Sequence, residues 1–289
     1  MMLLATSLIG RFTGFPFVLA LCLGDGVNHP KMLGPPSHID AVRYQSTPGP
    51  YEKMADKSVT KAKFQTCHDD FKAIIGPKPV AEVILQIEDY PFAHEAGVYF
   101  DETNELFITS NQFTDHASGE KKVQISKISL GDDDLATSVK LEEIPSGAIH
   151  MANGGVNYKG GILFCAQGSA LQPSGLFLMQ STPPYSVEPV ITSYLGRPFN
   201  SVNDVVVHPD GSIWFTDPCY GHDQGYRPKP VLPNLVYRYD PITGSIRAMA
   251  DGFGRPNGIC FSPDFKTVYV TDTDQIRGPD IDCSRNASM

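Results

Sequence analysis

The stretch FNSVNDVVVHPDGSIWFTDPCYG, residues 199–221, combines two kinds of signal. Its second half has an apolar run on each side of a Pro-Asp-Gly turn, which predicts a β-hairpin because Gly and Asp favour the positive φ of tight turns. Its first half places Asn200, Asn203 and Asp204 just before the first apolar run. Asn and Asp are poor strand formers, so we expect these residues to lie just before a strand and to have a role other than forming it.

The same hairpin pattern recurs along the chain. The phrases YFDETNELFITSN, VNYKGGILFCAQG, VHPDGSIWFTDP and FSPDFKTVYVTDT each place a turn before an apolar strand. Aligned at Asp101, Tyr158, Pro209 and Pro263, they are 57, 51 and 54 residues apart. Repeats of this length that hold several strands are typical of β-propeller blades. A β-sandwich with chance similarity is the alternative.

The segments between the phrases also predict strands. KVQISKISL and NLVYRYDPITGSIRAMA alternate apolar and polar residues, and the latter has a hairpin turn at Thr243-Gly244. Helical periodicity is weak past Pro77, and only residues 51–75 suggest a helix. We therefore expect an all-β chain of the six-bladed β-propeller class, with about four blades in residues 77–289. A truncated chain is the simplest explanation, and a smaller intact propeller is the alternative. Open sheet edges would then promote association or poor solubility.

The N-terminal region has a different composition. Arg11 precedes FTGFPFVLALCLG, a run of about a dozen mostly apolar residues that is too short to span a bilayer but has the length of a signal-peptide core. We expect a signal peptide in residues 1–24, an N-terminal extension in 25–76 and secretion of the chain. A cytoplasmic chain is the alternative, because no clear small-x-small cleavage site follows the apolar run.

Composition excludes several classes of function. The formal net charge is -9 with a pI near 5.3, which argues against a nucleic-acid partner. The six cysteines form no CxxC pair, which makes a zinc site improbable. With 41% hydrophobic residues, the chain has enough apolar material for a sizeable core.

Oxygen-bearing side chains lie at a matched distance before three of the aligned positions. Glu95, Asn203 and Asn257 each precede their alignment residue by six positions. In a propeller, such residues start the innermost strands and lie at the mouth of the central channel. One carboxylate with neutral amides suits a hard cation such as Ca²⁺. The second blade fits less well, because Ala152 occupies that position and Asn153 is its neighbour.

These motifs carry a family resemblance. FAHEAGVYF, NSVNDVVVHPDGSIWFTDP and GRPNGICFSPDFKTVYVTDT resemble the gluconolactonase and senescence marker protein family, and more narrowly the fungal lactonohydrolases. The resemblance covers residues 77–278. It implies a six-bladed propeller that holds Ca²⁺ or another divalent cation and hydrolyses lactones of sugar acids and related hydroxy acids. Glu95, Asn203 and Asn257 match the family's metal ligands. Asp204 matches an aspartate that helps to hold a second, structural cation in the paraoxonases.

The chain departs from the family at one ligand. A further aspartate, the usual candidate for the general base, has no counterpart here, and the resemblance stops after Gly278. Asp280 and Asp282 lie nearby but have no repeat context. His94, beside Glu95, is the candidate for a base or proton shuttle, and His150 is a weaker one. Either histidine can instead be a packed or surface residue.

Other features of the sequence have structural explanations. Trp214 and Phe215 lie in a core strand, Ser169 lacks the Gly-x-Ser-x-Gly frame of a serine hydrolase, and residues 225–233 form either a lid or a surface loop. The expected partner is a small lactone, with a homo-oligomer also compatible with the sequence. Two other functions compete: a non-catalytic binding or scaffold propeller, and a metal-independent enzyme similar to strictosidine synthase.

Overall fold

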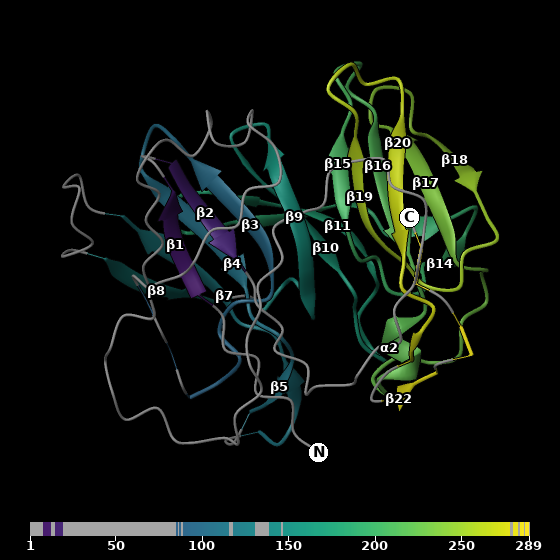
Figure 1. Cartoon of the computed structure of the whole chain (residues 1–289), viewed down its shortest axis with the longest axis horizontal. Helices are drawn as coiled ribbons and strands as arrows, with labels where there is room; N and C mark the ends of the chain where they lie inside the picture. Colours follow the sequence, from purple (N-terminus) through teal and green to yellow (C-terminus); the bar gives the residue numbers. More distant parts are fainter. Residues whose placement is uncertain are drawn as a thin grey trace, which may run out of the picture.

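The protein is a stack of antiparallel β-sheets (Figure 1). The computed structural model describes residues 8–12, 15–19, 85, 87, 89–115, 118–130, 139–145, 147–277, 280–282, 284–285 and 287–288. Within this part of the chain, the one helix is α2 (Tyr220–Asp223). The prediction of an all-β chain is confirmed.

Three sheets have four strands each, in the order of a meander. The first contains β3 (Glu95–Phe100), β4 (Glu105–Thr109), β7 (Ile125–Ser129) and β8 (Lys140–Ile144). The second contains β9 (Ala152–Tyr158), β10 (Gly161–Ala166), β11 (Gly175–Gln180) and β12 (Val187–Ile191). The third contains β15 (Val205–Val207), β16 (Ile213–Asp217), β17 (Leu235–Asp240) and β18 (Ser245–Ala250).

The remaining strands form pairs. The pair of β19 (Pro256–Phe261) and β20 (Val268–Asp272) continues the series as the start of a fourth blade. Short pairs join β5 (Phe113–Thr114) to β6 (Lys121–Lys122), β13 (Ser193–Tyr194) to β14 (Arg197–Pro198), and β21 (Ile276–Arg277) to β22 (Asp280–Ile281). A separate hairpin joins β1 (Leu8–Phe12) to β2 (Phe15–Leu19).

The four repeated phrases fold as the predicted hairpins. Each joins the first two strands of its blade, and the turns contain positive-φ residues such as Asn104, Gly160, Gly211 and Phe265. The Thr243-Gly244 turn closes a further hairpin between β17 and β18, with Gly244 at φ 70°. The turn chemistry in the sequence therefore sets the register of every blade.

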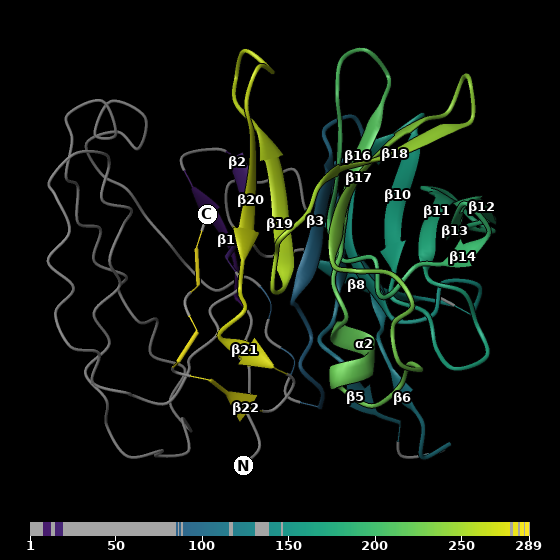
Figure 2. The same cartoon turned by 90° about the vertical axis from the view of Figure 1, so that its right-hand side faces the viewer.

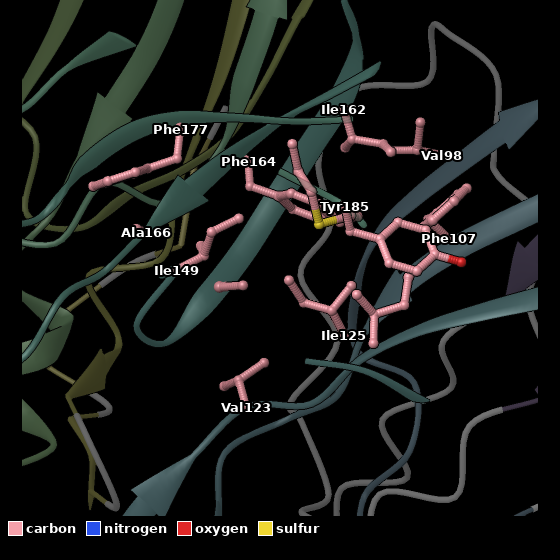
Figure 3. Packing of buried hydrophobic residues seen from close by; sticks show 14 of the residues in the cluster. Val98, Phe107, Val123, Ile125, Ile149, Ile162, Phe164, Ala166, Phe177 and Tyr185 are labelled. Atoms are coloured by element: carbon pink, nitrogen blue, oxygen red, sulfur yellow. The ribbon is translucent and has the colours of Figure 1, made fainter. Parts of the chain in front are cut away.

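Successive sheets lie face to face (Figure 2), and the second blade buries both of its faces between its neighbours. On β10, Ile162 and Phe164 pack toward the first blade, in the cluster that Figure 3 draws. Leu163 and Cys165 of the same strand pack toward the third blade. This series of face-to-face sheets is a partial propeller and not a two-sheet sandwich, and the predicted fold class is confirmed. Each fully buried large apolar side chain contributes about 1.5–3 kcal/mol.

Several predictions lie outside the described residues. These are the helix in 51–75, the extension in 25–76 and the start of the propeller near Pro77. In the segment expected to be a signal peptide, only the backbone of β1 and β2 is described. Among the described helices, none is long and apolar enough to cross a membrane.

Candidate functional site

The first strands of the four blades, β3, β9, β15 and β19, lie side by side in blade order. Oxygen-bearing side chains occur where these strands begin. We call them the inner-strand cluster, which consists of Glu95, Asn153, Asn203, Asp204 and Asn257. Backbone and side-chain hydrogen bonds connect its members and their neighbours from one blade to the next.

Asn203 lies between the second and third blades. Its backbone N–H donates to Thr216 O at 3.0 Å, and its carbonyl accepts from Gly154 N at 2.9 Å. Its side chain is 4% exposed, and its Oδ1 is buried without a hydrogen-bond partner. A buried polar atom without a partner is unfavourable by about 1–3 kcal/mol, so this oxygen is suited to a ligand.

Asp204 ties the third blade to the fourth. Its Oδ1 accepts from Val205 N at 2.8 Å, and its Oδ2 accepts from Ile259 N at 2.9 Å. Burial raises the pKa of this carboxyl, although both hydrogen bonds act in the opposite direction. Both oxygens therefore already have backbone partners within the protein.

Asn257 is oriented by its neighbours. Its backbone carbonyl accepts the Thr216 hydroxyl at 2.7 Å, which crosses from β16 to β19. Its Nδ2 donates to the Tyr220 hydroxyl of α2 at 3.1 Å. Because the amide nitrogen is held by Tyr220, the amide oxygen Oδ1 is the atom left for a ligand. Tyr220 also hydrogen-bonds the Thr273 hydroxyl.

Glu95 starts β3 at a β-bulge and pairs with Thr109 of β4. Burial, and next the charge of Asp204, raise the pKa of Glu95 to about 7. His94 Nε2 lies 3.8 Å from Glu95 Oε1, which is longer than a hydrogen bond. Burial lowers the pKa of His94, so its imidazole is neutral at pH 7 and can accept a proton.

Asn153 of β9 joins this cluster although counting along the sequence placed Ala152 at its position. It is 6% exposed, and its Oδ1 is buried without a partner. Its carbonyl accepts the Thr109 hydroxyl at 3.0 Å, as Asn257 O accepts that of Thr216. The offset failed because the turn after β9 is shorter than the other three: Tyr158 is the last paired residue of β9, whereas Asp101, Pro209 and Pro263 lie in the turns. The Asn-Gly-Gly motif was the available signal.

The segment before Asn203 is held between the buried carboxyl of Asp217 and the partly buried guanidinium of Arg227. Asp217 accepts Asn200 N at 3.0 Å and Ser201 N at 2.8 Å. On the other side, Arg227 donates to Phe199 O at 2.7 Å and to Asn200 O at 3.0 Å. Asn200 thus has a structural role, and its Nδ2 contacts three backbone carbonyls.

The weaker candidates are also placed. Ser169 Oγ accepts backbone N–H groups of Leu171 and Gln172, which is an ordinary turn arrangement. Residues 225–233 are fixed near their start by two side chains. Tyr226 donates to Gln167 Oε1 at 2.6 Å, and Arg227 donates to the backbone carbonyls of Ser169 and Gln172. His150 lies in the turn before β9. Phe215 is fully buried, and Trp214 is partly buried on the same strand.

Among the described residues, no three His, Cys, Asp or Glu side chains cluster as a metal site. Cys165, Cys219 and Cys260 are free thiols. A cation site here would thus depend on amide oxygens together with Glu95.

Propeller blades with amide and carboxylate oxygens at the start of their inner strands define the class of this protein. Residues 124–288 match the family model described as the SMP-30/Gluconolactonase/LRE-like region. The chain belongs to this family, as its motifs predicted.

Individual proteins are also similar to this chain. The chain is 33% identical over 244 residues to lactonohydrolase oryL of Aspergillus oryzae, covering 81% of this chain and 52% of the relative. It is 27% identical over 265 residues to lactonohydrolase oryH of the same organism, covering 70% and 53%. A solved gluconolactonase of Xanthomonas campestris is 26% identical with a TM-score of 0.49, covering 64% of this chain and 56% of that one. The chain spans about half the length of the two curated relatives.

Proposed function

We propose that the protein hydrolyses lactones of sugar acids or related hydroxy acids, with Ca²⁺ or another divalent cation at the inner-strand cluster. The observation that carries this proposal is the Oδ1 of Asn203, which is buried and has no hydrogen-bond partner. This atom lies in a cluster of oxygen-bearing side chains supplied by four consecutive blades. The family, and the names of the two Aspergillus relatives, support the reaction class.

The residues present fit a hard cation. The cluster offers only carboxylate and amide oxygens, which Ca²⁺ prefers, and the unpartnered oxygen of Asn203 lacks any protein donor. Glu95, Asn203 and Asn257 would hold the cation. Bound there, it would polarise the lactone carbonyl and stabilise the oxyanion that forms on attack by water. Asp204 remains a candidate for a second, structural cation.

The side chains supply the remaining functions. Tyr220 holds the Asn257 amide by its nitrogen, which presents Oδ1 toward the cluster. His94, whose pKa burial lowers, would take the proton from the attacking water. His94 is the candidate because it lies beside the proposed ligand Glu95, with its Nε2 3.8 Å from Glu95 Oε1. The ring oxygen of the lactone then leaves with a proton as the hydroxyl of the hydroxy acid.

The test is acid release from an aldonolactone, followed in a pH-stat with the full chain. We expect turnover with Ca²⁺, loss of turnover with excess EDTA, and loss in Asn203→Ala. Asn157→Ala, an exposed asparagine on β9, serves as the control and should retain turnover. Turnover that survives EDTA would favour the metal-independent enzyme, and Ca²⁺ binding without turnover would favour the binding protein.

A further inference from the structure

Asn153 of β9 occupies the same structural position in its blade as Asn257 in the fourth blade. A threonine near the end of the preceding blade's second strand donates its hydroxyl to the asparagine carbonyl in both cases. Thr109 contacts Asn153 O at 3.0 Å, and Thr216 contacts Asn257 O at 2.7 Å. Both hydrogen bonds cross from one blade to the next. The equivalence therefore rests on matched contacts and not on counting along the sequence.

The neighbours of Asn153 place it against the other members of the cluster. On one side, Thr109 is the pairing partner of Glu95. On the other, the next residue, Gly154, donates to Asn203 O at 2.9 Å. A Cβ at Gly154 would lie 2.7 Å from both Asn203 O and Asp204 Oδ1, closer than side chains pack. Glycine thus allows β9 to approach the third blade.

The Asn153 amide oxygen is itself unsatisfied. It is buried and has no hydrogen-bond partner, as is the case for Asn203 Oδ1. Asn200 also has an unpartnered Oδ1, but its Nδ2 binds carbonyls outside the cluster. The unpartnered Oδ1 atoms of Asn153 and Asn203 belong to adjacent blades, whose backbones are joined by the hydrogen bond from Gly154 N to Asn203 O. This arrangement indicates a shared ligand that accepts electron pairs.

We propose that Asn153 is a further oxygen ligand of the divalent cation, supplied by the second blade. The proposal rests on the proposed function, since it concerns the same site. It gives four consecutive blades one donor each: Glu95, Asn153, Asn203 and Asn257. Ca²⁺ takes six to eight oxygen ligands, so a neutral fourth donor from the protein fits its coordination and leaves positions for substrate and water.

The test is a titration of the EDTA-treated full chain with Ca²⁺ alone, followed by isothermal calorimetry. Asn153→Ala should weaken the affinity about tenfold, since one ligand is lost. Asn153→Asp should tighten it by a similar factor, because calcium affinity follows the charge of the ligands. Asn157→Ala is the matched control, an exposed asparagine four residues further along β9 whose Nδ2 binds Tyr99 O, and should bind as wild type.

The outcomes separate this proposal from the proposed function. If wild type binds Ca²⁺ and Asn153→Ala binds it equally well, Asn153 is not a ligand, although the lactonase proposal stands. If wild type turns over lactone without binding Ca²⁺, both the cation and this role of Asn153 are overturned. Should Asn153→Ala fail to fold, the near-isosteric Asn153→Asp decides the matter. A rise in its melting temperature with Ca²⁺ no larger than that of wild type would refute the proposal.

Discussion

Asp217 is a carboxyl group with no exposed surface, and its pH dependence can be worked out. Burial raises its pKa to about 7, against the opposing effect of its two backbone hydrogen bonds. In the unfolded chain, the Asp217 carboxyl ionises near pH 4. Asp217 therefore contributes most to folded-state stability below that pH. This contribution falls as pH rises toward 7, by about 4 kcal/mol at most.

The corresponding substitution is Asp217→Asn, which cannot ionise. We expect the unfolding free energy of the variant, relative to wild type, to rise between pH 4 and pH 8. Urea unfolding in EDTA at several pH values measures it. The contrast is the exposed Asp210, whose pKa is lowered, chiefly by hydrogen bonds from Ser212. Asp210→Asn should lose stability relative to wild type as pH rises through 4. Parallel profiles for all three proteins would contradict the assignment for Asp217.

At the scale of elements, the short helix α2 is attached to the start of β19. Arg255 Nε binds Asp223 Oδ2 at 2.7 Å, and both side chains are largely buried. The Tyr220 hydroxyl, also on α2, accepts a hydrogen bond from Asn257 Nδ2 of β19. A four-residue helix has little stability of its own, so these contacts hold it and, through Tyr220, set the orientation of a candidate ligand.

Tyr220→Phe therefore removes the acceptor that fixes Asn257. A neutral hydrogen bond contributes about 0.5–1.5 kcal/mol, so we expect calcium affinity to fall about 2- to 13-fold. Calorimetric titration with Ca²⁺ measures this effect, and a melting curve shows whether the fold is kept. Tyr226→Phe is the matched control, since its hydroxyl binds Gln167 outside the cluster. Equal calcium affinities for the two variants would remove Tyr220 from this role.

The elements were predictable where turn residues and β-branched runs coincide. The hairpins at Lys159-Gly160, Asp210-Gly211 and Thr243-Gly244 follow from local chemistry, so the sequence predicted their strands well. Counting along the sequence missed Asn153 because the turn after β9 is shorter than the other three, so that the alignment residue Tyr158 still belongs to the strand. The helix α2 has too few residues for periodicity. The hydrogen bonds of Asp217 and Arg227 to residues 199–201 join segments that are distant in the sequence, so no local pattern predicts them.

At the scale of the whole molecule, each blade depends on its neighbours to cover its faces. The second blade is covered on both sides by apolar clusters. In the fourth blade, β20 pairs with β19 along one edge, and on the other the described residues supply only the bridge between Asp272 and Ser288. An edge strand with unpaired backbone groups is a template for pairing with another chain.

We therefore expect the purified chain to associate through β20 at micromolar concentrations. Tyr269, 43% exposed in the middle of this strand, is the position to alter, because a lysine on an edge strand opposes pairing. Light scattering after size exclusion, over a range of concentrations, should show Tyr269→Lys shifted toward monomer. Met249→Lys, at a similarly exposed position on β18, should associate as wild type does. A wild-type chain that stays a monodisperse monomer and melts in one sharp transition would show that this edge is protected, and association would then have no part in its function.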